Sequence, residues 1–86
     1  MAISSGQVTV GLTPTPIDGT HNSNFKLTIH NMNNDDSIYL GNSDVTPLNG
    51  LQLLKLETIQ LQLNPLELIY AVSTKENLKL GYLKQV

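Results

Sequence analysis

Two histidines are the residues of this chain best suited to hold a metal ion. His21 and His30, with a carboxylate such as Asp18, make a candidate metal site, because imidazole and carboxylate are common ligands of transition metals. However, His21 falls in a polar loop, and His30 falls on the outward phase of a predicted strand. We therefore interpret both as solvent-exposed polar residues.

Asp and Asn residues cluster in the predicted connections and make a candidate Ca²⁺ site. They are Asn33, Asn34, Asp35, Asp36, Asn42 and Asp44. Their oxygens suit Ca²⁺, but the spacing matches no EF-hand loop. Asx turns, in which the side chain bonds to its own backbone, explain Asn and Asp in such connections without an ion. We expect no metal and no cofactor.

Catalytic constellations are not found in the sequence. No serine lies in Gly-x-Ser-x-Gly, and no Gly-rich phosphate loop is present. Glycoside hydrolysis needs two acids about 5 to 9.5 Å apart in a cleft, and so short a chain implies none. We predict that the protein is not an enzyme.

Length and composition point to one small domain that gains stability from other copies. The 86 residues contain no cysteine, which excludes disulfides, and a core this small favours oligomerisation. Five Lys, no Arg and seven Asp or Glu give a net charge of −2, which argues against nucleic-acid binding. No signal peptide or apolar span is evident, so we expect synthesis in a cytoplasm and no membrane insertion.

The chain alternates with period two, which is typical of strands. Gln7–Leu12 predicts a first strand with Val8, Val10 and Leu12 on one face, ended by the Pro-containing residues 13–16. Residues 1–6 precede it as a candidate flexible N-terminal arm. Phe25–Asn31 predicts a second strand with Phe25, Leu27 and Ile29 inward, and we expect it to form a hairpin with Ile38–Leu40.

A helix competes with strands only over Leu51–Leu63, where good helix formers are common. The alternation of Ile59, Leu61 and Leu63 with Gln favours strands, and residues 53–57 are interpreted as a tight connection between two of them. A turn at residues 64–66 follows. Residues 68–73, apolar on both faces, predict a central strand, and residues 78–84 a last one.

Seven to eight short strands separated by turns predict an all-β fold, a small antiparallel β-sandwich or jelly-roll-like barrel formed by residues 1–86 as one domain. Ser43, Asp44 and Thr46 lie in its most patterned loop. We expect them to fix that loop, with the Asp44 carboxylate accepting backbone N–H groups as the chain crosses between sheets.

Leucines exceed what the inward faces of these strands require. The surplus comprises Leu48, Leu51, Leu53, Leu54, Leu56, Leu66 and Leu83. Exposed leucines on strand edges invite association, so we expect burial between subunits. The interface candidates are Leu48, Leu54, Leu56, Leu66 and Leu83.

The order of strands and turns resembles that of small tailed-bacteriophage virion structural proteins. The matching segments are a strand ending in Asn31, then Ile38–Gly41, Ser43–Thr46, Asn49–Leu53, Glu57-Thr58, Pro65 and Leu68–Val72. In that family, "valine-tyrosine-isoleucine-glycine", "serine-aspartate-valine-threonine" and "asparagine-glycine" precede a "glycine-glutamate-threonine" turn and a "leucine-tyrosine-alanine-valine" strand. The chain departs at Leu54–Leu56, where a Pro- or Gly-containing segment is usual, which makes Leu56 a candidate exposed apolar residue.

The resemblance implies a non-enzymatic virion protein that decorates or cements a capsid or forms a head fibre. It implies a homo-oligomer, with a trimer favoured, and a capsid or other virion protein as partner. The alternative is a receptor- or carbohydrate-binding module of a tail or fibre. Sugar rings usually stack on aromatic faces, and this chain has no Trp and only Tyr39, Tyr70 and Tyr82 as tyrosines.

Overall fold

Alternating apolar and polar residues form eight strands in the computed structural model, which describes residues 3–17 and 23–85. They are β1 (Ile3–Val10), β2 (Thr15–Pro16), β3 (Phe25–Asn31), β4 (Ile38–Gly41), β5 (Leu51–Leu53), β6 (Thr58–Leu63), β7 (Tyr70–Val72) and β8 (Leu78–Gln85). Within these residues there is no helix, and hence none that could cross a membrane. The all-β prediction is confirmed.

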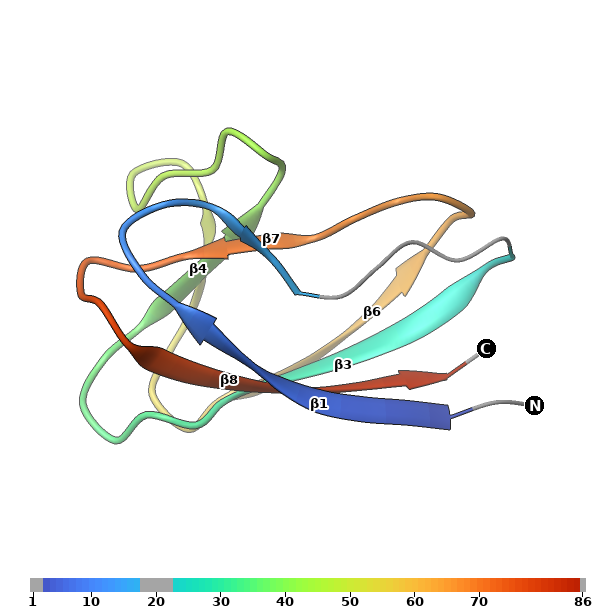
Figure 1. The fold of residues 1–86 in the computed structure, drawn as a ribbon, viewed down its shortest axis with the longest axis horizontal. Helices are drawn as coiled ribbons and strands as arrows, with labels where there is room; N and C mark the ends of the chain where they lie inside the picture. The colour runs from blue at the N-terminus through green and yellow to red at the C-terminus, as the bar shows by residue number, and fades with distance from the viewer. Residues whose placement is uncertain (1–2, 18–22, 86) are drawn as a thin grey trace.

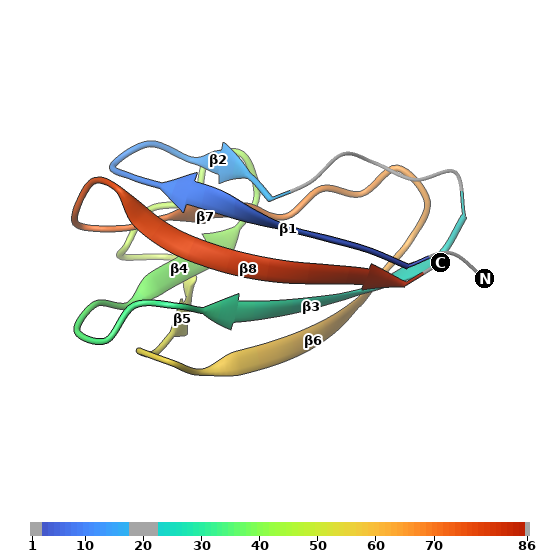
Figure 2. The same cartoon turned by 60° about the horizontal axis from the view of Figure 1, so that its bottom comes forward.

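The strands form two antiparallel sheets of four strands each, in the orders β1-β8-β3-β6 and β2-β7-β4-β5. The sheets lie face to face as the two layers of a sandwich (Figure 1). The first of these sheets has the longer strands, so we call it the larger sheet or layer and the other the smaller one. A second view places β6 at the open edge of the larger layer, with β3 as its neighbour on the inner side (Figure 2). Each sheet therefore keeps two unpaired edges.

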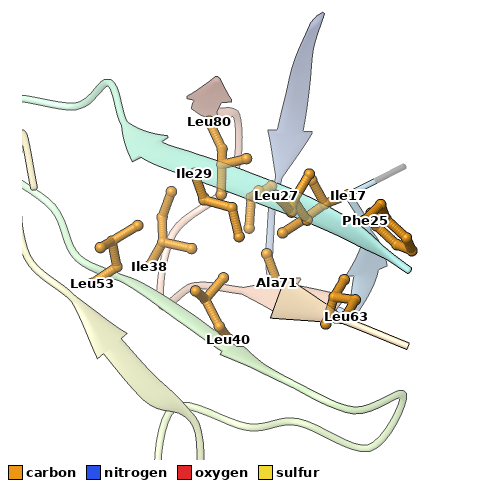
Figure 3. Close-up of a cluster of buried hydrophobic side chains, with 11 residues drawn as sticks. Ile17, Phe25, Leu27, Ile29, Ile38, Leu40, Leu53, Leu63, Ala71 and Leu80 are labelled. Atoms are coloured by element: carbon orange, nitrogen blue, oxygen red, sulfur yellow. The ribbon is translucent and has the colours of Figure 1, made fainter. Parts of the chain in front are cut away.

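The core fills the space between the two layers (Figure 3). Ile29 of β3, Ile38 of β4 and Leu80 of β8 have no exposed surface. Burying such a side chain stabilises a fold by about 1.5–3 kcal/mol. The prediction that Phe25 and Leu27 point inward with Ile29 is confirmed, because all three are buried.

The predicted hairpin between β3 and β4 is wrong. β3 pairs with β6 and β8, whereas β4 pairs with β5 and β7 in the other sheet. The connection between them therefore crosses from one layer to the other. Closeness in sequence does not distinguish a hairpin from such a crossing, because both need only a short polar connection.

The first strand differs from its predicted limits at both ends. Residues 3–6, expected as part of a flexible arm, belong to β1 and pair with β8, from Ile3 opposite Gln85 onward. At the other end β1 stops at Val10, so Leu12 is an exposed residue rather than a core one. Leu12 instead donates its backbone N–H to Oε1 of Glu76 at 3.1 Å.

Over Leu51–Leu63 the strand interpretation is confirmed. β5 and β6 flank a tight turn, and β7 lies centrally between β2 and β4, as expected of the apolar 68–73 segment. Leu53, counted among the surplus leucines, is a buried core residue. Leu53 of β5 lies opposite Ile38 of β4, and the sequence could not specify this pairing without the strand order.

A buried asparagine joins the two layers at one end. The Asn31 side chain is fully buried, and its Nδ2 donates to the carbonyl oxygens of Asp36 (2.8 Å), Leu53 (3.1 Å) and Leu54 (3.2 Å). Its Oδ1 accepts from the backbone N and the Nδ2 of Asn33, at 3.0 and 2.8 Å. One side chain thus ties two of the connections between the sheets, β3–β4 and β5–β6, to the end of β3.

Asn33 extends this network to β8. Its Nδ2 donates to the Lys79 carbonyl at 2.9 Å, and its Oδ1 accepts from the Lys79 backbone N at 3.2 Å. The side-chain amide therefore satisfies both backbone groups of Lys79, as a neighbouring strand would. We call Asn31 and Asn33 together the asparagine clamp.

Candidate functional site

Two turns with the same construction stand at the two ends of β6. In the first, residues 54–57, the Glu57 N–H donates to the Leu54 carbonyl at 3.0 Å, and the Leu54 N–H donates to Glu57 Oε1 at 2.9 Å. In the second, residues 64–67, the Glu67 N–H donates to the Asn64 carbonyl at 3.3 Å, and the Asn64 N–H donates to Glu67 Oε1 at 2.6 Å. A glutamate closes each turn twice, once through its backbone and once through its side chain.

The third residue of each turn is a leucine with left-handed backbone. The φ angle is 56° at Leu56 and 66° at Leu66. Turns with positive φ at this position normally place Gly or Asn there, because a Cβ in the left-handed region costs about 1–2 kcal/mol. Among the described residues the remaining non-glycine case is Asn77, a residue type that tolerates this conformation.

Both leucines are also exposed. The fraction of surface open to solvent is 54% for Leu56 and 66% for Leu66, so neither leucine is held in place by the core. Each position therefore combines an unfavourable backbone conformation with an unburied apolar side chain. Folding of the single chain explains neither of these two features. We call Leu56 and Leu66 the two turn leucines.

The equivalence of the two turns was missed in the sequence. Both leucines were singled out as interface candidates, but not as corresponding positions. The signal was present, since a Leu-Glu pair occurs at residues 56–57 and again at residues 66–67. A left-handed φ favours glycine, so neither leucine has the residue type expected at its position.

Between the two turns, β6 presents an unpaired and unprotected edge. The Asn31 N–H donates to the Glu57 carbonyl at 2.9 Å, in line with the register that places Ile59 opposite Ile29. Ladder bonds in an antiparallel pair involve every second residue, so Ile59, Leu61 and Leu63 bond to β3. The backbone groups of Gln60 and its even-numbered neighbours therefore point away from the sheet.

Devices that normally protect such edges are missing from β6. Thr58–Leu63 contains neither a charged residue nor a proline, whereas natural edge strands are usually short or carry Lys or Pro. The smaller sheet follows that rule: β2 has two residues including Pro16, and β5 has three. We refer to β6 with its two flanking turns as the β6 edge.

All five leucines predicted as interface candidates are exposed. Leu54, Leu56 and Leu66 lie in the two turns of the β6 edge, so the structure brings three of them to one strand. Leu48 lies in the β4–β5 loop and is 99% exposed, and Leu83 lies on the outer face of β8, opposite Thr28. These two are separate from the β6 edge along the chain and in the sheet order.

The β4–β5 loop, residues 42–50, is built around Val45. Val45 is buried, and a Cβ added at Gly41 or Gly50 would lie 2.7 or 2.8 Å from its Cγ2. Both glycines are therefore needed for close approach rather than for a special φ. The loop therefore packs around its own buried side chain at the end of β4.

Asparagines, rather than Asp44, fix this loop. Asn42 Oδ1 accepts the Asp44 N–H at 2.9 Å, and Asn49 Oδ1 accepts the Thr46 N–H at 2.8 Å. Thr46 takes part as well, because its Oγ1 accepts the Leu48 N–H at 3.3 Å. No hydrogen bond to the Asp44 carboxylate comes from the part of the chain described here, and Ser43 is simply exposed.

A hollow of about 310 Å³ beside the loop is lined by Gly41, Asn42, Val45 and Asn49. None of the three tyrosines belongs to its lining. Tyr39 and Tyr70 are half-buried on the smaller sheet, and Tyr82 is half-buried on β8. The hollow therefore lacks the aromatic surface on which a sugar ring would stack.

Two of the candidate metal ligands that lie among the described residues have other partners in the structure. His30 Nδ1 lies 2.8 Å from Thr58 Oγ1 across the outer face of the sheet, and Asp36 forms an ion pair with Lys75 at 3.1 Å. His21 and Asp18 lie outside the described residues. Over residues 3–17 and 23–85 no group of three or more His, Asp or Glu side chains is placed to share an ion.

Comparison with known proteins finds no matching protein-family model, no similar curated protein and no similar solved structure. The resemblance to phage virion proteins therefore stays an expectation drawn from sequence motifs alone. The β6 edge and the loop around Val45 are features of the chain's own geometry.

Proposed function

We propose that this chain is a non-enzymatic structural subunit of a tailed-phage particle, acting through contacts with its own copies and with a capsid or other virion protein. Capsid decoration or a head fibre is the role that the sequence resemblance favours, and the virion is the proposed location. The observation that carries the proposal is the pair of turn leucines, exposed and held at positive φ.

The physical reason is that these positions lower stability in the isolated chain. Gly or Asn would fit each turn better, so leucine is expected there only if its side chain gains something elsewhere. Burial of an apolar side chain in a subunit contact supplies that gain, at about 1.5–3 kcal/mol for each leucine. Backbone strain of this kind is typical of residues that contact a partner.

The homo-oligomer is part of the same proposal. The resemblance favours a trimer, and the open edges of the larger sheet supply surfaces on which copies can meet.

The test is assembly of purified chain onto particles, with and without Leu56→Glu. We expect the wild-type chain to be found in particles by quantitative mass spectrometry, with hundreds of copies for a decoration protein. Leu56→Glu should lower the copy number several-fold while the isolated chain keeps its circular dichroism spectrum. The control is Thr74→Glu, which adds the same charge to the exposed β7–β8 turn, outside β6 and its two flanking turns.

Two outcomes contradict the proposal. The first is absence of the wild-type chain from particles; if a glycan array also shows selective binding, the chain is the carbohydrate-binding alternative. The second is an equal effect of Leu56→Glu and Thr74→Glu, since the turn leucine would then have no special part in assembly.

A further inference from the structure

The β6 edge is symmetric about one residue. Leu56 and Leu66 each lie five positions from Leu61, on opposite sides. If two copies of β6 pair in antiparallel fashion with a two-fold axis at Leu61, the turn that carries Leu56 in one copy comes level with the turn that carries Leu66 in the other. The two-fold axis repeats this match at the far end of the strand.

The backbone groups that this pairing needs are available. Gln60 and Gln62 direct their N–H and C=O groups away from β3, because the odd-numbered residues of β6 make the bonds to β3. With the axis at Leu61, Gln60 of one copy lies opposite Gln62 of the other, and about four ladder hydrogen bonds form between the copies. This ladder between the copies ends at Asn64 of each copy, because the Asn64 N–H already donates to Glu67 Oε1.

The faces of the two sheets also match in this register. Gln60 and Gln62 lie opposite Thr28 and Lys26 on the outer face, and Leu61 lies opposite Leu27 on the core face. A two-fold axis perpendicular to the sheet places outer residues opposite outer residues and core residues opposite core residues. The outer face and the core face of the larger sheet therefore each continue from one copy into the other.

The other long edge, β1, does not have this property. Its exposed apolar residues at the two ends are Ile3 and Leu12, and their midpoint falls between Gln7 and Val8. A two-fold pairing that brought Ile3 level with Leu12 would set Gln7, an outer residue, opposite Val8, a core-facing one. The alternation of faces forbids that register.

We propose that two copies of this chain associate through their β6 edges, antiparallel and centred on Leu61, so that two four-stranded sheets join into one continuous sheet. The partner is a second copy of the same chain. The proposal deepens the proposed function, on which it rests only for the expectation that copies associate. It replaces the trimer implied by the sequence resemblance with a two-fold contact, and hence with a dimer or an assembly of dimers.

A charge swap across the axis tests both the contact and its register. The double variant Gln60→Glu/Gln62→Glu places like charges opposite each other in both symmetric pairs. The matched variant Gln60→Lys/Gln62→Glu places opposite charges there, and it keeps the same residue opposite Lys26 within the subunit. Sedimentation equilibrium of both variants and of the wild type, at low salt, measures the dimer dissociation constant.

We expect a wild-type dimer, a dissociation constant at least about tenfold higher in the all-glutamate variant, and recovery in the Lys/Glu variant. Equal weakening in both variants would overturn the register, because pairing centred on Gln60 or Gln62 sets like charges opposite each other in both. Three other results would overturn the contact: a monomeric wild type, a trimer, or a dimer that neither variant affects. Circular dichroism confirms that each variant is folded.

The result is distinguishable from the test of the proposed function. A wild-type dimer with the expected charge dependence that never appears in particles supports the β6 contact and contradicts the virion role. A chain found in particles that is monomeric in solution contradicts the β6 contact and supports the virion role.

Discussion

The asparagine clamp contacts the β6 edge at Leu54, yet the side chains of the two regions differ in how well they suit the isolated chain. The Leu54 carbonyl accepts from the buried Asn31 Nδ2, and the Leu54 N–H begins the turn that exposes Leu56. On the buried side both polar side-chain atoms of Asn31 have partners. On the exposed side a leucine sits where a glycine would be less strained.

Folding of the chain explains why residue 31 is an asparagine, but it does not explain why residue 56 is a leucine. A buried amide is stabilising only when its hydrogen bonds are satisfied, and Asn31 satisfies its own fully. A leucine at positive φ is destabilising unless something outside the chain covers it. Changes at Asn31 and at the two turn leucines should therefore act with opposite sign on the stability of the isolated chain.

The largest effect is expected from Asn31→Leu. The change leaves the carbonyls of Asp36, Leu53 and Leu54 without the donor they share, and the bond to Leu53 is fully buried. We expect the free energy of unfolding to fall by about 3–5 kcal/mol, measured by urea denaturation. Asn34→Leu, at an exposed neighbouring position, is the control and should change it by less than about 0.5 kcal/mol. A loss below 1 kcal/mol at Asn31 would mean that the clamp does not hold the layers together.

A smaller loss is expected from removing the glutamate side chains that close the two turns. Glu67→Ala deprives the Asn64 N–H of its acceptor, and Glu57→Ala does the same for Leu54. Both sites are exposed, so we expect a loss of about 1 kcal/mol each in urea denaturation. Glu67→Gln keeps an oxygen acceptor and should lose less than Glu67→Ala. Equal losses would show that charge, rather than this hydrogen bond, is responsible.

The smallest effect, and the one of opposite sign, is expected from Leu56→Gly and Leu66→Gly. Each relieves a strained φ at some cost in chain entropy, so the free energy of unfolding of the monomer should rise by about 0.5–1 kcal/mol. Self-association should weaken in the same variants, measured by sedimentation. Asn77→Gly is the control at positive φ and should change both quantities little. A fall in monomer stability would show that the turn leucines serve folding after all.

Local signals in the sequence predicted the strands well and the pairing poorly. The alternation of Phe25, Leu27 and Ile29 fixes a strand and its buried face without reference to the rest of the chain. Which strand lies beside it depends on contacts far apart in sequence, so the β3–β4 hairpin was predicted where a crossing between layers occurs. The early start of β1 was missed because Ser4, Ser5 and Gly6 carry no strand signal of their own.

The candidate site, too, was predicted from the sequence only in part. Composition alone identified exposed leucines in excess of the core, including Leu56 and Leu66. Their left-handed backbone, their equivalence in two turns and the free edge between them became visible only with the turn geometry and the strand order. The loop-fixing role expected of Asp44 went to Asn42 and Asn49, since one polar residue can replace another in a loop without a change in pattern.

By itself the sequence determined an all-β chain, the inward faces of its main strands and a surplus of leucine, because period-two alternation and turn residues act locally. The tertiary structure decided the rest. It made β6 an edge rather than a central strand and buried Leu53. It also set the two turn leucines at opposite ends of one open ladder. Those outcomes depend on which strands meet across the sandwich, and that choice is made by the whole core at once.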